Sequence, residues 1–148
     1  MAHLLRSNLV AFVLICTSVA ASAQIKIAIV STVPDPVGER LVYANKEGIR
    51  RSSGMQVVDR VQDGLIRVNI VTLDPDKSDS SGNRTIYSVV WTAQTFHEIP
   101  VTMYLTNSVG ICGSSRVSQC ADGLIANTDE QATNVRGWIQ GTLEKGKK

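Results

Sequence analysis

Hydrophobic and polar positions alternate along much of the chain, and the period of the alternation changes several times. A short apolar run at 25–30 is typical of a buried strand. Apolar positions then recur at helical spacing over 37–49, which predicts an amphipathic helix. Asp35 suits the N-cap of this helix and Pro36 its first position, and we expect Gly54 to end it.

Strand patterns fill the middle of the chain. Residues 55–58 are predicted to form a second strand, far enough from the first to allow a parallel β-α-β crossover. Residues 66–71 alternate with a period of two, and 84–94 are rich in β-branched and aromatic side chains. These two segments flank a polar stretch at 74–83, so we predict an antiparallel hairpin with a long mobile tip.

The C-terminal part begins with a third alternating segment and ends in a helical pattern. Val101, Met103 and Leu105 are expected to be buried, whereas Tyr104 between them is expected to be exposed. A turn is predicted at 110–113. The apolar stripe that follows, from Val117 to Ile139, fits one long helix or two short ones, because Gly123 and Asn127 could interrupt it.

The element order β-α-β-β-β-β-α therefore predicts an α/β protein of the α+β type. We expect a mixed sheet of about five strands with two main helices on one face.

The first strand and helix lead into the sequence Ile-Arg-Arg-Ser-Ser-Gly-Met-Gln-Val-Val-Asp at 49–59. This passage resembles the corresponding part of small envelope modules, namely the TolB N-terminal domain and the CsgG-like domains. The resemblance covers the N-terminal third of the mature chain. It implies a strand-helix-strand fold and assigns no functional residue, and the propeller repeats of TolB are absent.

The first 23 residues have the three parts of a secretion signal. Arg6 is the positive residue, 9–19 form the apolar core, and Ala21-Ser22-Ala23 is a small-x-small cleavage site. The apolar core is shorter than the roughly 20 residues that span a bilayer. We therefore predict a cleavable signal at 1–23, one globular domain at 24–148, a periplasmic or secreted protein, and no membrane span after cleavage.

The cysteine content also fits an exported protein. Cys16 is lost with the signal, which leaves Cys112 and Cys120 eight positions apart. Two cysteines in an oxidising compartment most often form a disulfide, and this is the expected state. A redox pair or a metal site is the alternative, although redox pairs usually have CxxC spacing.

Candidate chemistry is sparse. His97 is the one histidine of the mature chain, which argues against multi-histidine metal sites, and a serine hydrolase would have to use it without a GxSxG motif. Asp74, Asp76 and Asp79 do not have the spacing of an EF-hand, although weak calcium binding stays open. We expect no metal, no cofactor and, from the small net charge of +2, no nucleic acid.

Two local motifs do not by themselves predict a function. The segment 110–115 before the last helix has the glycines and serines of an anion cradle but lacks a Walker A lysine. Asn83-Arg84-Thr85 is a glycosylation sequon, which has a meaning only in a eukaryotic source.

The sheet face away from the helices is the candidate interaction face. Tyr87 or Trp91 is expected on one face or the other, and aromatic side chains on a polar sheet suit protein contacts. The residues predicted to form this face are Arg67, Asn69, Thr102, Tyr104 and Thr106.

Our first hypothesis is a non-catalytic exported module that binds another envelope or extracellular protein or a surface component, in an unknown oligomeric state. The alternatives are a small exported hydrolase that uses a serine with His97, or a small-ligand carrier with a pocket between helix and sheet. Substitution of His97 by Ala separates the first two, because it would abolish only the hydrolase.

Overall fold

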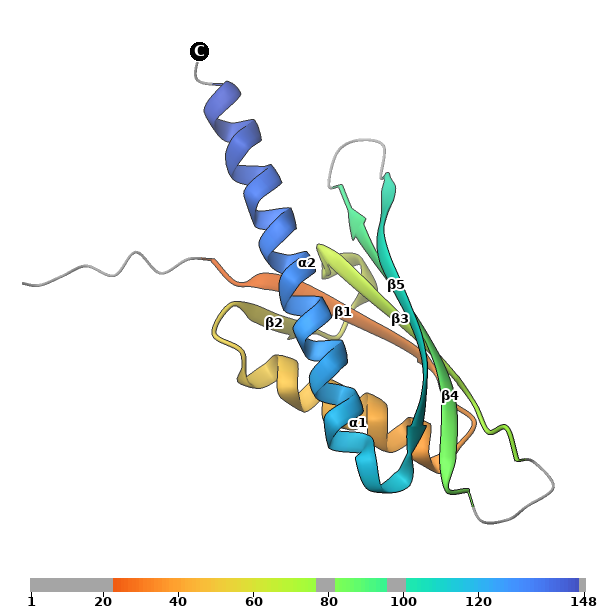
Figure 1. The fold of residues 1–148 in the computed structure, drawn as a ribbon. Coiled ribbons are helices and arrows are strands. Elements are labelled where there is room, and N and C mark those ends of the chain that lie inside the picture. Colours follow the sequence, from red (N-terminus) through yellow and green to blue (C-terminus); the bar gives the residue numbers. More distant parts are fainter. Residues whose placement is uncertain (1–22, 77–81, 96–100, 147–148) are drawn as a thin grey trace, which may run out of the picture.

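A five-stranded sheet and two helices make up the computed structural model, which describes residues 23–76, 82–95 and 101–146 (Figure 1). The elements in chain order are β1 (Ile25–Thr32), α1 (Pro36–Arg51), β2 (Met55–Val58), the 3-10 turn η1 (Val61–Asp63), β3 (Ile66–Leu73), β4 (Arg84–Gln94), β5 (Thr102–Gly113), the 3-10 turn η2 (Ser114–Arg116) and α2 (Val117–Lys145).

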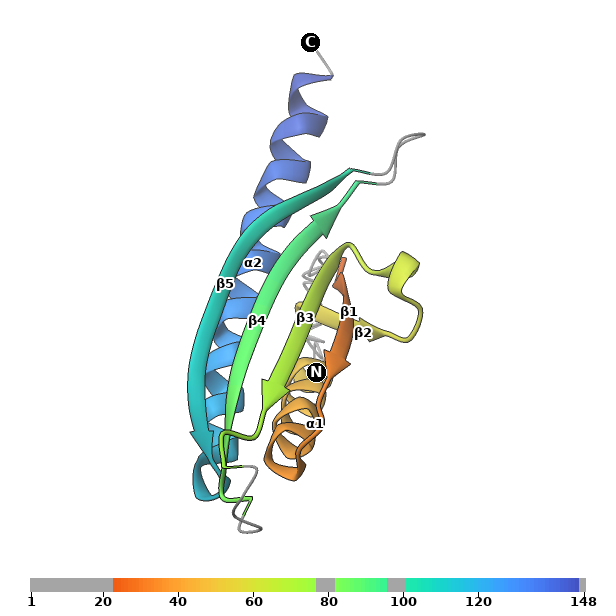
Figure 2. The same cartoon turned by 90° about the vertical axis from the view of Figure 1, so that its right-hand side faces the viewer.

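The strands lie in the order β2-β1-β3-β4-β5. β1 is parallel to both β2 and β3, whereas β3, β4 and β5 form an antiparallel meander. Both helices lie on the same face of this sheet (Figure 2). The predicted fold class, element order and mixed sheet are therefore confirmed, as are the parallel crossover and the hairpin of β3 with β4.

Helix α1 begins where the sequence indicates and ends slightly earlier. Asp35 is its N-cap and accepts a hydrogen bond from the Gly38 N–H, and Pro36 is the first helical residue. The C-cap is Ser52 and not Gly54, so that prediction was wrong. Ser52 has extended backbone angles and its N–H donates to the Ile49 carbonyl, so the chain turns into β2 without a left-handed residue.

Helix α2 is one continuous helix of 29 residues, which decides between the two alternatives left open by the sequence. A Cβ at Gly123 would meet no atom, so this glycine lies at an open surface and does not interrupt the helix. The predicted turn at 110–113 was wrong. These residues continue β5, because they pair with Arg84–Tyr87 of β4.

The core lies between the sheet and the two helices. Its largest fully buried side chain is Trp91, whose indole N–H donates to the Thr128 hydroxyl at 2.9 Å. Thr128 in turn donates to the Leu124 carbonyl of the same helix. Trp91 therefore belongs to the helix-covered face, and this polar contact fixes α2 against β4. Buried apolar side chains from both helices and from β1 to β4 complete the core: Ile27, Leu41, Ile49, Met55, Ile66, Val68, Ile70, Val89 and Leu124.

A β-bulge in β5 changes which side chains face the helices. Trp91 pairs with Thr106, but the next residue, Thr92, pairs with Tyr104, so Leu105 has no partner of its own. Consequently Met103 and Thr106 both lie on the helix side, and Tyr104 lies on the other. Tyr104 is 64% exposed, as predicted.

The burial predicted for this segment was only partly right. Leu105 packs against the core, whereas Val101 is 51% and Met103 39% exposed. Val101 directly precedes β5 and Met103 is its second residue, beyond the part of the sheet where the helices pack most closely. The alternation of polar and apolar residues predicts on which face of the sheet a side chain lies. It does not predict how much of that face the helices cover.

Candidate functional site on the outer sheet face

The sheet face opposite the helices carries several exposed aliphatic side chains. We call them the outer patch: Val30, Val71, Leu73, Val109 and Ile111. The strand register places them all on this face, since Ile66, Val68 and Ile70 of β3 face the helices and the intervening residues face outward. Val109 is 68% and Ile111 66% exposed, so the two residues from β5 are the most exposed members of the outer patch.

Four of the five residues predicted for the interaction face lie on it. Arg67 pairs with Thr92 and Thr92 with Tyr104, so these three form a row across β3, β4 and β5. The Tyr104 hydroxyl donates to the Asn107 side chain at 3.1 Å, and the Asn69 amide donates to the Val90 carbonyl at 3.4 Å. Thr102 pairs with Gln94 at the beginning of β5.

Thr106 is separated from the other four. It pairs with Trp91 and therefore shares the helix side of the sheet, because the bulge at Leu105 reverses the alternation. The aliphatic members of the face were not predicted from the sequence. A signal for Val71 was present, since it continues the outward register of Arg67 and Asn69. Val109 and Ile111 were missed because their segment was taken to approach a turn.

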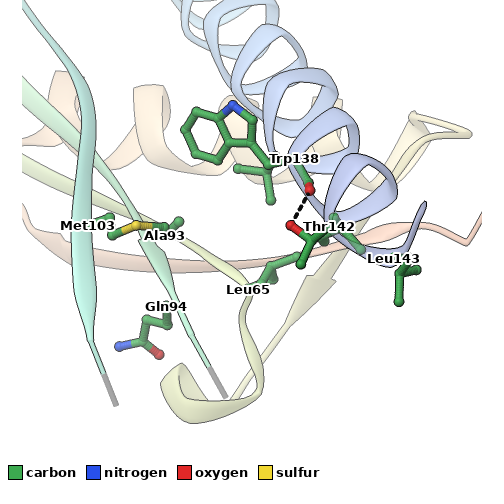
Figure 3. A pocket seen from close by; sticks show the side chains of 9 residues that line it. Leu65, Ala93, Gln94, Met103, Trp138, Thr142 and Leu143 are labelled. Atoms are coloured by element: carbon green, nitrogen blue, oxygen red, sulfur yellow. Dashed lines mark hydrogen bonds between the residues drawn. The ribbon is translucent and has the colours of Figure 1, made fainter. Parts of the chain in front are cut away.

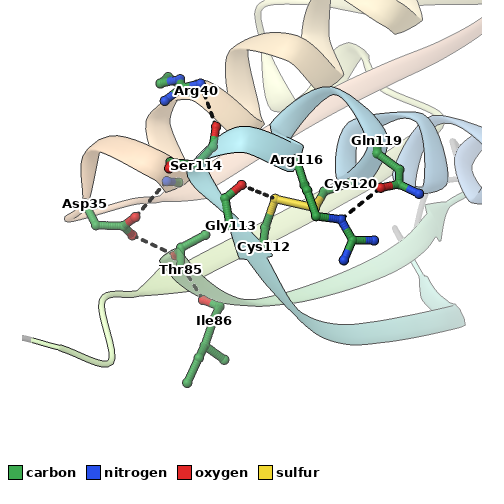
Figure 4. The surroundings of a disulfide bond; sticks show 11 residues. Asp35, Arg40, Thr85, Ile86, Cys112, Gly113, Ser114, Arg116, Gln119 and Cys120 are labelled. Atoms are coloured by element: carbon green, nitrogen blue, oxygen red, sulfur yellow. Dashed lines mark hydrogen bonds between the residues drawn. A yellow bond between two sulfur atoms is a disulfide. The ribbon is translucent and has the colours of Figure 1, made fainter. Parts of the chain in front are cut away.

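A buried carboxylate lies where α1 begins, near the end of the sheet (Figure 4). Asp35 accepts hydrogen bonds from the Gly38 N–H at 2.7 Å and from the hydroxyls of Thr72 and Thr85 at 2.5 and 3.0 Å. These three donors are neutral, and the two threonine hydroxyls fix the start of α1 against β3 and β4. A Cβ at Gly38 would lie 2.2 Å from the Thr72 hydroxyl oxygen, so glycine is required for this contact. We interpret this cluster as structural.

The structure joins Cys112 and Cys120 in a disulfide, which fits the pairing predicted from the sequence (Figure 4). The bridge ties the end of β5 to the first turns of α2. Next to it, the Arg40 guanidinium donates to the Ser114 carbonyl at 2.9 Å, which links α1 to η2. The N-cap of α2 is Arg116, which makes no side-chain capping hydrogen bond. The segment 110–115, which has the glycines and serines of an anion cradle, is the end of β5 followed by part of η2.

The acidic segment after β3 is engaged with an arginine. Arg84 donates two hydrogen bonds to the Asp76 carboxylate, at 2.6 and 2.8 Å, and these lower the pKa of Asp76 and raise the pKa of Arg84. The Asp74 carboxylate accepts from the Asp76 N–H. In the described ranges no group of three or more metal-ligating side chains comes together. Asp79 and His97 lie outside the described residues, so the calcium and hydrolase hypotheses stay predictions from the sequence.

A hollow lies between the C-terminal part of α2 and the sheet (Figure 3). Its volume is about 370 Å³. Trp138, Ile139 and Leu143 of α2 line one side, and Leu65, Ala93 and Met103 line the other. We call this hollow the apolar groove. The Thr142 hydroxyl, its main polar neighbour on the helix, already donates to the Trp138 carbonyl at 2.9 Å.

In the part of the chain that the structure describes, no helix is both long enough and apolar enough to cross a membrane.

No protein-family model matches the chain, and no curated protein matches it. Solved structures do. One is the PelC L103M dodecamer from Paraburkholderia phytofirmans, at 13% identity, with a TM-score of 0.43 and coverage of 72% of this chain and 88% of that one. Another is lipoprotein GNA1162 from Neisseria meningitidis, at 14% identity, with a TM-score of 0.33 and coverage of 74% and 99%.

These are distant similarities, and at such scores neither one assigns a function or a family to this chain. The resemblance to the TolB and CsgG-like domains stays a prediction from the sequence. The function is therefore inferred from the side chains of the chain itself.

Proposed function

We propose that the chain is an exported, non-catalytic module that binds another protein of the envelope or the extracellular space through its outer sheet face. The observation that carries this proposal is the outer patch. Val71, Leu73, Val109 and Ile111 are each at least 45% exposed, and they lie on one rigid face.

The energetic argument follows from the exposed area. Burying apolar surface contributes roughly 25 cal/mol per Å², and monomeric proteins rarely leave several aliphatic side chains exposed together on one surface. Tyr104 and Arg67 add the residue types that dominate protein contacts, an aromatic ring with few rotatable bonds and a planar cation. The face is thus apolar over β3 and β5, with a polar row at Arg67 and Tyr104.

The face is also held in shape before any partner binds. Its strands are backed by the core and the last strand is tied to α2 by the disulfide. A preformed surface loses little conformational entropy on association, which favours binding.

Photo-crosslinking in the host provides the test. A photoreactive amino acid replaces Leu73 on the outer face or, as a matched control, Tyr43, which is 67% exposed on α1. We expect irradiation to give one discrete adduct from the Leu73 position and none from the Tyr43 position. Tyr104→Ala should reduce the yield of that adduct and leave the circular dichroism spectrum unchanged.

Equal labelling from both positions, or none from Leu73, would exclude the outer face as the binding surface. His97→Ala in the same strain serves as the control for the hydrolase alternative, because a binding module should keep its adduct and its phenotype without the histidine.

The apolar groove supports a second candidate, a carrier of a small apolar molecule. Trp138 lies at its rim and offers a direct signal, since its emission responds to an apolar ligand (Figure 3). A carrier should bind 1-N-phenylnaphthylamine with one saturable site, and Leu143→Glu should abolish that site. If wild-type protein gives no saturable signal, the groove does not carry ligands.

A further inference from the structure

β5 is the longest strand and forms one edge of the sheet, with no described strand on its other side (Figure 2). An open edge offers a row of backbone N–H and C=O groups to another strand. Natural proteins protect long edges with charged side chains or proline. β5 contains neither over its whole length, Thr102–Gly113. Its one irregularity, the bulge at Leu105, leaves the stretch 106–113 regular.

This stretch also carries the two most exposed members of the outer patch. Val109 and Ile111 are two residues apart on the same face, with Gly110 between them. On the helix side, the Tyr87 ring lies over Gly110, and a Cβ there would be 2.5 Å from the Tyr87 hydroxyl oxygen. Glycine in a strand also permits close approach of a second backbone.

We propose that two copies of this chain pair through β5, antiparallel, with the twofold axis at Gly110, to form one continuous sheet across both copies. In this register Val109 of one copy lies opposite Ile111 of the other, and the reverse pair follows by symmetry. Opposite side chains on one face of an antiparallel pair are in contact, so both aliphatic residues gain an apolar neighbour.

The absence of charge on β5 favours a second copy over another occupant. In a twofold contact each edge strand meets an identical copy of itself, so an edge with charges of one sign would repel its copy, whereas a neutral edge does not. A charged peptide would find no complementary side chain along Thr102–Gly113. The contact shares Val109 and Ile111 with the outer patch, but it is made through the backbone groups of the sheet edge and leaves Val71 and Leu73 free for the partner proposed above.

Sedimentation velocity on the mature protein tests the proposal. We expect wild type to form a concentration-dependent dimer with a dissociation constant in the micromolar range. Ile111→Glu should raise this dissociation constant by about tenfold or more. Val71→Glu is the matched control, since it places the same charge on the same face two strands from the edge, and it should dimerise as wild type does. Thermal unfolding of each variant at low concentration verifies that the monomer is folded.

A mixture of charges tests the register. Val109→Lys and Ile111→Glu should each dimerise poorly alone. Mixed, they should form a heterodimer in which the introduced lysine of one copy faces the introduced glutamate of the other, and the second pair is the native Val109 with Ile111. A monomeric wild type at all concentrations, equal loss in Val71→Glu, or no recovery in the mixture would each overturn the proposal.

Discussion

Asp35 is the residue on which several segments of this fold meet. Its carboxylate caps α1 and also accepts from threonine hydroxyls of β3 and β4, although these residues lie 37 and 50 positions further along the chain. Asp35, Thr72 and Thr85 are all buried. A buried acceptor with three donors stabilises the fold well beyond an exposed cap, because its loss leaves other polar groups without partners.

Asp35→Ala should therefore lower the free energy of unfolding by about 2–4 kcal/mol, because the helix loses its cap and the Thr72 and Thr85 hydroxyls lose their shared carboxylate acceptor. Chemical denaturation measures this change. Glu39→Ala is the control, because it removes a carboxylate from the same first turn at an exposed position and should cost less than about 1 kcal/mol. Equal losses in the two variants would mean that the threonine contacts contribute nothing.

At the scale of elements, the junction between β5 and α2 depends on the disulfide. The bridge joins positions eight residues apart, across the three residues of η2. A loop of this length stabilises by roughly 2–3 kcal/mol in the chain-entropy model.

Cys112→Ser should lower the melting temperature of the oxidised protein, and reductant should lower that of the wild type by a similar amount. Differential scanning calorimetry with and without reductant measures both. Reductant should have no effect on the Cys112→Ser variant. Two free thiols per chain in untreated exported protein would contradict the bridge.

The beginning of β5 offers a second prediction at this scale. Met103 and Ala93 are register partners on the helix side, but Ala93 is 3% exposed and Met103 39%. A carboxylate at Ala93 would be buried without a partner, whereas one at Met103 reaches water through the open groove. We therefore expect Ala93→Asp to unfold the domain and Met103→Asp to keep a cooperative thermal transition at a lower temperature. Loss of that transition in Met103→Asp would show that the groove is closed in solution.

At the scale of the whole molecule, the proposed function requires export. The predicted signal at 1–23 lies almost wholly outside the described residues, and β1 begins at Ile25, the second residue after the predicted cleavage site. Mass spectrometry of the periplasmic or secreted protein should find Gln24, or its cyclised form, as the first residue. A stable product that retains Met1 would contradict export by cleavage.

Local patterns in the sequence determined most of the architecture. The period-two and helical repeats identified the strands and α1, and Asp35 with Pro36 located the start of that helix, because these signals depend on neighbours a few residues away. The two cysteines of the mature chain, together with the predicted export, likewise indicated the bridge. The residues of the outer face were identified in part, since Arg67, Asn69 and Tyr104 follow simple alternation.

Only the tertiary structure decided the remainder, because it depends on contacts distant in sequence. The bulge at Leu105 arises from pairing with β4, and it moves Thr106 to the helix side. Val109 and Ile111 are outward because their segment continues as a strand paired with residues 84–88 of β4. The threonine partners of Asp35, the groove under α2 and the open edge of β5 follow from strand order, and strand order is a property of the assembled sheet.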